Sequence, residues 1–336
     1  MIAAPLLLAA NMHAATLNEI RQAHKLPALS RAKLQDGRLA VEDSGSTKNH
    51  GHWHLGSDTK AMTATLLARF VERGKLKWDS KLGELFPSMD MDPAFTGVTV
   101  EMLTSQRSGI PNTMDGYPGL WGKLWDLGDE VSQGRELVAR TILAAPPAST
   151  PGSRFEYSNS NYIIAGLILE RISGLSWERL VERDLFRPLG MRCGFGSVWG
   201  HETKDGKLVP IFKDNPPSLG PAGTVHCSLA DWAKFAQLHL DGAAGRPTKL
   251  LKTASFAKLH AAPPGQDYTY GGWIKVQRGW AGPTGFALTH AGSNTMNYAV
   301  LWLAPEKNLA LMAATNAAGP QAEQATDEAV AGLIAP

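Results

Sequence analysis

The sequence has almost no net charge, because 33 Lys and Arg residues face 31 Asp and Glu residues and leave a formal charge of +2. Without a basic excess, the sequence predicts no electrostatic binding to nucleic acid or to an anionic membrane. Charged residues are also scarce, at 19% of the chain against 43% hydrophobic residues, which excludes a disordered or fibrous protein. The 336 residues, with 10 Trp, therefore predict one large globular domain or two closely packed ones, with a cleft.

Long apolar segments are absent as well. After the first residues, no stretch reaches the ~18 uncharged apolar residues that a membrane-spanning helix needs. Met1–Ala10 is a short apolar run, and small residues follow up to Ala15. This pattern indicates a signal peptide over residues 1–15 and a periplasmic or secreted protein. The basic segment that usually precedes such a run is missing, since the first Lys or Arg is Arg21. An ordinary helix start in a cytoplasmic protein is the alternative.

Only two cysteines occur, Cys193 and Cys227. Two cysteines exclude a disulfide-rich scaffold, and no Cys-x-x-Cys metal motif is present. One bridge between them can form, but two separate buried thiols are the favoured interpretation.

Hydrophobic periodicity and turn residues predict the secondary structure. Asp36-Gly37 is a hairpin signal between two short strands. The predicted helices are 17–26, 58–73, 136–143, 161–172, 177–184, 229–240 and 321–333. The predicted strands are 28–35, 38–43, 52–56, 272–277, 286–289, 298–303 and 309–315.

Strands therefore lie at both ends of the chain, and helices lie in the middle. We expect an α/β (α+β) fold in which both chain ends form one antiparallel sheet flanked by helices, with an inserted all-helical domain. The α/β body comprises residues 16–75 and 223–336, and the mainly helical insert comprises residues 76–222. The cleft between the two parts is the expected place for a site.

The first candidate motif is Ser57-Asp58-Thr59-Lys60. Ser and Lys three residues apart share one face of a helix, so a neutral Lys60 amine could take the proton of the Ser57 hydroxyl. Free N–H groups at the start of a helix can also face an oxyanion. The same spacing recurs at Ser30 and Ser255, but only Ser57 follows a predicted strand and glycine and opens a strongly periodic helix.

Two further motifs follow in the chain. Tyr157-Ser158-Asn159 comes just before the 161–172 helix, and a phenol beside a lysine ammonium can have a lowered pKa and relay a proton. The alternative is a loop tyrosine beside a helix cap. His290-Ala291-Gly292-Ser293 ends a predicted strand, where glycine would let a substrate lie against the strand edge. The alternative there is a strand ending in a glycine turn.

In this order, the three motifs resemble those of the penicillin-recognising serine hydrolases of the class C β-lactamase type, which are Ser-x-x-Lys, Tyr-x-Asn and Lys/His-x-Gly. That family includes D,D-carboxypeptidases, D-aminopeptidases and β-lactamase-like esterases. Connecting stretches such as 98–111, 188–191 and 221–223 are similar too, and the resemblance extends over roughly residues 20 to 335. It implies the split α/β body with a helical insert, and it implies no cofactor and no metal ion.

The resemblance also implies roles for single residues. Ser57 would be the acylated nucleophile, Lys60 the general base or the charge that activates Tyr157, and Tyr157 the proton relay. Asn159 would position the substrate and Lys60.

In the third motif, the resemblance implies that His290 and Gly292 contact the substrate, and that the backbone amides of Ser57 and Ser293 form the oxyanion hole. His290 replaces the usual lysine and is mostly neutral at pH 7, while Ala291 lacks the usual hydroxyl. Both departures favour small esters, amides or short peptides as substrates. The alternatives are a β-lactamase or D,D-carboxypeptidase proper, and a non-catalytic penicillin-binding-like sensor.

Two other features could contribute to a site. His50, His52 and His54 alternate along a predicted strand and could bind a metal ion in a metal-dependent hydrolase, although no acidic ligand lies beside them. The segment Asn112–Asp129 carries Tyr117, Trp121 and Trp125 and could form an apolar wall of the cleft. Plain packing of the insert would explain those aromatic residues equally well. The sequence indicates no oligomeric state.

Overall fold

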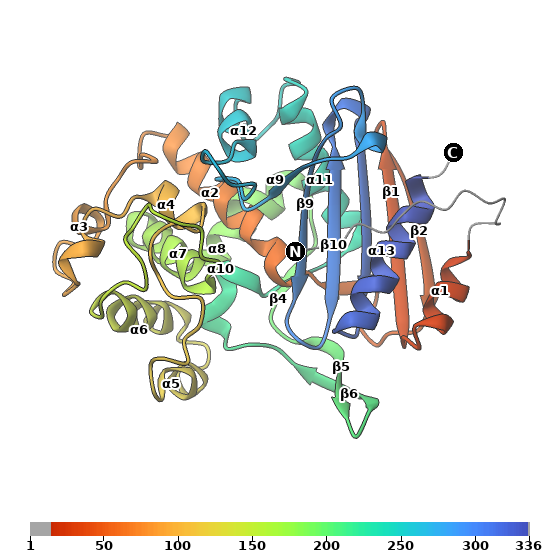
Figure 1. The fold of residues 1–336 in the computed structure, drawn as a ribbon, viewed down its shortest axis with the longest axis horizontal. Helices are drawn as coiled ribbons and strands as arrows, with labels where there is room; N and C mark the ends of the chain where they lie inside the picture. The colour runs from red at the N-terminus through yellow and green to blue at the C-terminus, as the bar shows by residue number, and fades with distance from the viewer. Residues whose placement is uncertain (1–14, 335–336) are drawn as a thin grey trace.

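A computed structural model describes residues 15–334 of the chain. Its main element is a six-stranded antiparallel sheet with the strand order β2-β1-β11-β10-β9-β8 (Figure 1). The strands are β1 (Ala28–Gln35), β2 (Arg38–Gly45), β8 (Ile274–Gln277), β9 (Phe286–Ser293), β10 (Tyr298–Ala304) and β11 (Leu309–Thr315). Strand β1 pairs with β11 so that Leu29 lies opposite Thr315. Both ends of the chain therefore build one sheet, which confirms the predicted fold class.

Apolar cores cover both faces of this sheet. Every residue of β11 is buried, and its side chains alternate between two hydrophobic clusters, because successive side chains point to opposite faces. Met312 belongs to the larger cluster, which extends into the helices of the insert, and Leu311 belongs to the smaller one. Helices α1 (Leu17–Ala23) and α13 (Pro320–Ile334) contribute to the smaller cluster, and α2 (Thr59–Glu72) and α11 (Leu229–Ala243) contribute to the larger one.

The helical region lies beside the sheet, with α2 between the two parts (Figure 1). The remaining α-helices are α3 (Leu82–Leu85), α4 (Val100–Thr104), α5 (Leu120–Asp126), α6 (Val131–Leu143), α7 (Asn159–Ser173), α8 (Trp177–Val181), α9 (Arg187–Leu189), α10 (Gly220–Gly223) and α12 (Thr253–His260). Short 3₁₀ or π turns are η1 (Gly56–Asp58), η2 (Pro93–Phe95), η3 (Glu182–Phe186), η4 (Pro217–Leu219), η5 (Gly279–Ala281) and η6 (Pro305–Lys307).

Helix α7 is the buried helix at the centre of this region. Ser158 caps its first turn by accepting a hydrogen bond from the N–H of Ser160, and Gly174 ends it in the left-handed conformation at φ 70°. All residues from Ser160 to Glu170 are buried. The helix can therefore hold residues at its N-terminus in a fixed position toward the sheet.

The region 76–222 is not all-helical, contrary to the prediction. Strands β5 (Val198–Lys204) and β6 (Lys207–Lys213) form a hairpin that projects from the body (Figure 1). A small sheet with the order β3-β7-β4 joins β3 (His52–His54), β7 (Val225–Ser228) and β4 (Gly194–Phe195). Most residues of β6 are exposed, including Val209 and Phe212, so β6 does not show the alternation of buried and exposed residues that marks a half-buried strand. The Asp205-Gly206 pair, both at positive φ, was the available signal for its turn.

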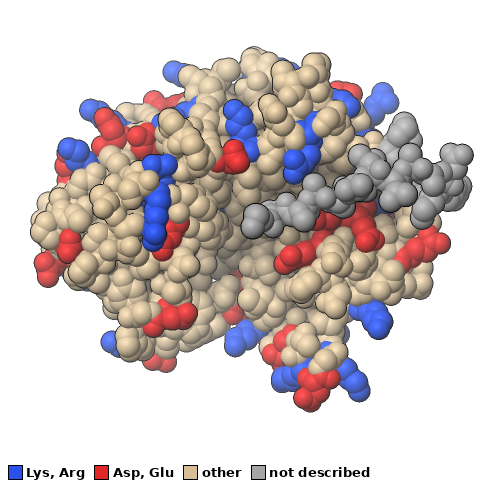
Figure 2. Space-filling view, in the orientation of Figure 1, with Lys and Arg blue, Asp and Glu red and all other residues tan. Residues whose placement is uncertain are grey.

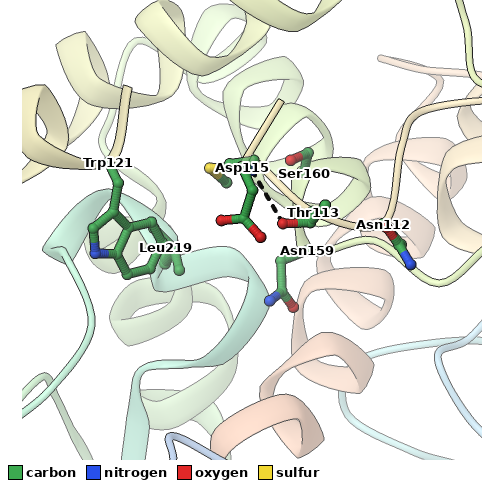
Figure 3. Close-up of a pocket in the computed structure, with 8 residues that line it drawn as sticks. Asn112, Thr113, Asp115, Trp121, Asn159, Ser160 and Leu219 are labelled. Atoms are coloured by element: carbon green, nitrogen blue, oxygen red, sulfur yellow. Dashed lines mark hydrogen bonds between the residues drawn. The ribbon is translucent and has the colours of Figure 1, made fainter. Parts of the chain in front are cut away.

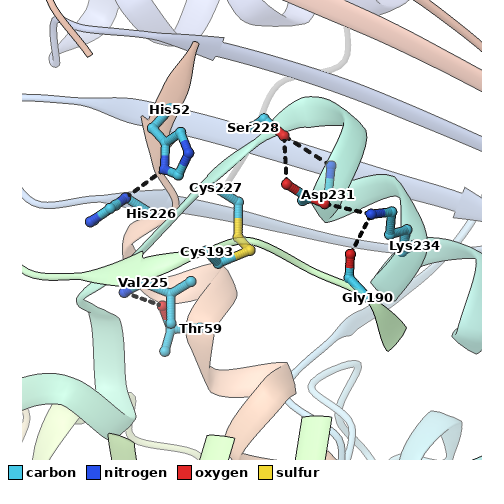
Figure 4. Close-up of a disulfide and its surroundings, with 10 residues drawn as sticks. All are labelled: His52, Thr59, Gly190, Cys193, Val225, His226, Cys227, Ser228, Asp231 and Lys234. Carbon is cyan, nitrogen blue, oxygen red and sulfur yellow. Dashed lines mark hydrogen bonds and ion pairs between the residues drawn. A yellow bond between two sulfur atoms is a disulfide. The ribbon is translucent and has the colours of Figure 1, made fainter. Parts of the chain in front are cut away.

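Cys193 and Cys227 form a disulfide (Figure 4). The preference for two separate thiols was therefore wrong. Strand β4 pairs with β7 so that Gly194 lies opposite His226, and this pairing brings the two Cα atoms to 4.5 Å, within bonding range. The bond joins the segment between α9 and β4 to β7, the strand that precedes α11.

Replacing both cysteines, as Cys193→Ser with Cys227→Ser, should lower the free energy of unfolding. The disulfide closes a loop with a sequence separation of 34 residues, and a cross-link over that length restricts the unfolded chain by about 3–4 kcal/mol. Urea denaturation of the oxidised wild type and the double variant would measure the difference. Reduced wild type should unfold with the midpoint of the double variant. Equal midpoints for the variant and the oxidised wild type would contradict the prediction.

Within residues 15–334, no helix is both long enough and apolar enough to cross a bilayer. Both signs of charge are spread over the face seen in Figure 2, and most of that face is uncharged. The predicted signal peptide, except for Ala15, lies outside the described residues.

Candidate active site

Ser57 lies on a tight turn between β3 and α2. Strand β3 ends at His54, the turn η1 covers Gly56–Asp58, and α2 starts at Thr59. Gly56 has a φ of 49°, and a Cβ atom at this position would lie 2.3 Å from the backbone nitrogen of Ser293. Only glycine allows this approach, so the turn holds Ser57 against the end of β9.

Lys60 is fully buried beside Ser57. Its Nζ atom lies 2.9 Å from Ser57 Oγ, 2.8 Å from Asn159 Oδ1 and 2.7 Å from the carbonyl oxygen of Ala222. Burial lowers the pKa of Lys60 to about 7, although Asp58 opposes the shift. Burial also raises the pKa of Asp58 well above its usual value, and the Lys60 charge opposes this shift. A neutral Lys60 amine would donate to Asn159 and Ala222 and accept the proton of Ser57.

Tyr157 is held next to this pair by Gln106. The N–H groups on either side of the tyrosine donate to Gln106: that of Glu156 to the backbone oxygen at 2.8 Å and that of Ser158 to Oε1 at 3.0 Å. The Lys60 Nζ atom lies 4.9 Å from the centre of the phenol ring. Gln106 lies in the family-like segment 98–111, but no local pattern in the sequence predicts that it holds Tyr157.

The expected lowering of the phenol pKa was wrong. Burial raises the pKa of Tyr157 above its usual value, and a hydrogen bond with Ser57 offsets the shift only in part. Desolvation disfavours the phenolate, and the charge of Asp58 adds to the increase. Tyr157 therefore stays a neutral phenol that can donate a proton, and Lys60 is the group with the pKa of a base.

Asn159 is the first residue of α7, and it also lines a cavity of about 280 Å³ (Figure 3). In Figure 3 the Asp115 carboxylate lies between the side chains of Trp121 and Asn159. Trp121, which is 44% exposed, belongs to the predicted aromatic wall, and its side chain lines this cavity. Its other lining residues are Asn112, Thr113, Met114, Ser160 and Leu219.

The third motif lies within β9, because the strand predicted to end at Thr289 continues to Ser293. Strand β8 pairs with β9 only as far as Thr289, which lies opposite Ile274, the first residue of β8. The residues of the motif, which follow Thr289, therefore have no paired residue in β8. A Cβ atom on Gly292 would lie 1.9 Å from the oxygen of Leu55 and 2.6 Å from the nitrogen of Ser57. The glycine is therefore required for contact with the Ser57 turn, not only for substrate access.

These contacts place the backbones at Ser57 and Ser293 side by side. Ser293 is further fixed by its hydroxyl, which donates to the backbone oxygen of Asn297 at 2.8 Å. Two neighbouring backbone segments at a helix start and a strand end can direct N–H groups to one oxygen.

His290 is buried between two tyrosines. Its ring centre lies 6.5 Å from that of Tyr157 and 6.0 Å from that of Tyr268. Burial, with a smaller effect of Lys60, lowers the pKa of His290 to about 3. The residue is therefore neutral near pH 7 and provides no fixed positive charge, as expected from the histidine at this position.

The alternating histidines do not converge on one site. His52 pairs through Nδ1 with Nδ1 of His226 at 2.9 Å (Figure 4), whereas His54 bonds to Asp214. His50 lies on an exposed turn at φ 50°. In the described part of the chain, no three His, Cys, Asp or Glu side chains lie together as metal ligands would.

Comparison with known proteins agrees with this geometry. The family described as beta-lactamase matches residues 13–335 of the chain. Penicillin-binding protein 4 of Amycolatopsis lactamdurans is 27% identical over 332 residues, covering 88% of this chain and 82% of that protein.

Two solved structures show the same fold. The octameric penicillin-binding protein homologue from Pyrococcus abyssi has a TM-score of 0.74 and 24% identity, covering 94% of this chain and 75% of that chain. A D-stereospecific amidohydrolase from Streptomyces sp. has a TM-score of 0.75 and 21% identity, covering 94% of this chain and 96% of that chain.

Proposed function

Because the chain belongs to the β-lactamase family of penicillin-recognising serine hydrolases, we propose that it hydrolyses small esters, amides or short peptides through an acyl-enzyme on Ser57. The observation that carries the proposal is the buried Lys60 amine, 2.9 Å from Ser57 Oγ and with its pKa lowered to about 7 by burial. A neutral amine at this distance is a general base for the hydroxyl.

The reaction follows from the positions of the groups. Lys60 takes the proton of Ser57, and Oγ attacks the substrate carbonyl. The N–H groups of Ser57 and Ser293 stabilise the oxyanion. Tyr157 donates its proton to the leaving alcohol or amine and regains one from the Lys60 ammonium. Water then attacks the acyl-enzyme with the same groups acting in reverse, which releases the acid and the free Ser57 hydroxyl.

The neutral His290 supports substrates without a carboxylate at this position. A lysine there would attract a carboxylate through its fixed charge, which histidine with a pKa lowered to about 3 by burial lacks. The amidohydrolase among the structural neighbours is compatible with amide substrates. A β-lactamase or D,D-carboxypeptidase proper, and a sensor that is acylated but does not turn over, are the alternatives.

Labelling with a fluorophosphonate tests the proposal. Intact-mass measurement should show one added phosphonyl group, and peptide mapping should place it on Ser57. In parallel assays, chromogenic short-chain esters and amino-acid p-nitroanilides should be turned over faster than nitrocefin. A folded protein that takes no label, or takes it at another residue, would overturn the proposal. Stable penicillin acylation without turnover of any substrate would favour the sensor.

We also propose that the protein is exported to the periplasm or secreted. The Cys193–Cys227 disulfide supports this location, because disulfides persist in oxidising compartments. The apolar run Met1–Ala10 supports it independently. Fractionation of the producing cells, with N-terminal sequencing of the mature protein, would test the location and the cleavage site.

A further inference from the structure

Three buried polar side chains lie directly behind the Ser57 turn. His54, Asp214 and Asn294 are 1%, 4% and 1% exposed. They come from the end of β3, from the chain just after β6 and from the turn between β9 and β10. The Asp214 carboxylate accepts from His54 Nε2 at 2.8 Å and from Asn294 Nδ2 at 3.0 Å. One carboxylate therefore joins three segments that are distant in the sequence.

The first connection ends at the nucleophile turn. The N–H of Gly56 donates to His54 Nδ1 at 3.1 Å, so Nδ1 carries the lone pair. The ring proton must then be on Nε2, where it is donated to Asp214. This tautomer orients the peptide immediately before Ser57.

The second connection ends at the other side of the candidate oxyanion hole. Asn294 follows Ser293 directly, and its Oδ1 accepts from the N–H groups of Met296 and Asn297 at 3.2 and 2.9 Å. The carbonyl of Asn297 in turn accepts from the Ser293 hydroxyl. The turn after β9 is therefore fixed by Asn294, and Asn294 is fixed by Asp214.

The β5–β6 hairpin supports the same turn. The N–H of His201 donates to the oxygen of Met296 at 3.0 Å, and a Cβ atom on Gly200 would lie 2.5 Å from Asn297 Nδ2. The hairpin thus packs closely on the turn and ends at Asp214.

We propose that Asp214, through His54 and Asn294, is a positioning residue that sets the two oxyanion-hole N–H groups relative to each other. None of the three side chains takes part in proton transfer. This inference rests on the proposed acyl-enzyme function. Hydrogen bonds that orient a reacting group commonly have a large effect on the reaction rate. Small displacements of preorganised donors weaken the stabilisation of the transition state.

Asp214→Asn is the sharpest test, because an amide of the same shape cannot accept both hydrogen bonds. Its NH₂ group must face either Asn294 Nδ2 or His54 Nε2. Asn294 cannot turn over without losing its bonds to Met296 and Asn297, and the other His54 tautomer would point a proton at the Gly56 N–H. We expect kcat and the rate of phosphonylation to fall about 10- to 100-fold, with KM nearly unchanged.

Asp184→Asn is the matched control. Asp184 is also buried, and it bonds to Arg183 and Arg73. Arg73 follows α2, 16 residues after Ser57, which is roughly 24 Å along a helix. This variant should lose stability and keep the wild-type phosphonylation rate. A boronic acid that forms a tetrahedral adduct at Ser57 should bind Asp214→Asn more weakly by the same factor as the loss in kcat.

The outcomes separate the two proposals. If the wild type is not phosphonylated, the proposed function fails. If the wild type is labelled and Asp214→Asn is labelled equally fast, the positioning role is overturned. If Asp214→Asn does not fold, Asn294→Ser serves instead, because serine can still accept from the loop but cannot reach Asp214. It should fold and react several-fold more slowly; an unchanged rate in a folded protein would overturn the role.

Discussion

Ser57→Ala is expected to abolish acyl-enzyme formation and to reduce ester or amide turnover by about 10³-fold or more. The hydroxyl oxygen is the atom that forms the covalent bond, and no other serine in the described residues lies against a buried lysine of lowered pKa. The melting temperature should stay close to that of the wild type. The Ser57 side chain is not part of either hydrophobic cluster, so its removal leaves the apolar packing unchanged. Lys60 keeps its hydrogen bonds to Asn159 and Ala222.

A second Ser-x-x-Lys sequence in the same chain provides the matched control. Ser255 lies on α12 and donates to Glu72, while Lys258 bonds to Glu101. Ser255→Ala should therefore leave turnover unchanged. The measurement is initial-rate hydrolysis of a chromogenic ester, with circular dichroism and intact-mass analysis after fluorophosphonate treatment. If the folded Ser57→Ala variant still hydrolysed the ester and still took the fluorophosphonate label, the assignment of the nucleophile would be refuted.

Lys60→Met is expected to lower kcat/KM by about 10² to 10⁴-fold, the usual contribution of a general base. In the wild type, burial lowers the Lys60 pKa to about 7, and only the neutral amine can take the Ser57 proton. Acylation should therefore rise with pH through about 7 and be lost below it. Lys60→Arg should lower kcat/KM by a similar factor, because a guanidinium remains protonated and cannot act as the base.

The test is the pH–rate profile of acylation, measured as the rate of fluorophosphonate labelling. The measurements should cover a range of about four pH units, from about pH 5 to about pH 9, which extends to both sides of the Lys60 pKa. The wild-type inflection should disappear in Lys60→Met. Lys258→Met, which removes the lysine of the control sequence, should keep the inflection. A Lys60→Met variant with the wild-type inflection would show that another group is the base. Melting curves of each variant would show whether a lost rate reflects a lost fold.

Local patterns were sufficient for most of the fold. The Asp36-Gly37 turn and the short strand-like segments at both ends of the chain predicted β1, β2, β10 and β11. The Leu301-Trp302-Leu303 segment is apolar at successive positions, which indicates a strand covered on both faces of its sheet. The spacing of Ser57 and Lys60, and its place between a strand and a helix, predicted a pair that the structure brings to 2.9 Å. These features depend on residues that are neighbours in the sequence, so the sequence shows them directly.

Only the tertiary structure decided the features that depend on burial or on contacts between residues that are distant in the sequence. The disulfide exists because β4 pairs with β7. The β5–β6 hairpin was missed because most of β6 is exposed, and because β5 packs on a turn that is distant in the sequence. The Tyr157 pKa is raised, not lowered, because burial outweighs the opposing effect of the hydrogen bond with Ser57.

The same distinction applies within the site. The sequence by itself indicated which residues could be nucleophile, base and proton relay. Helix spacing pairs Ser57 with Lys60, and the resemblance of the three motifs to those of the family implies the other roles. Only the tertiary structure showed that Gly292 is required by the Ser57 turn and that Asp214 joins His54 to Asn294. The physical reason is that close backbone approach, desolvation and hydrogen bonds between distant segments exist only once the sheet and the helical region have packed together.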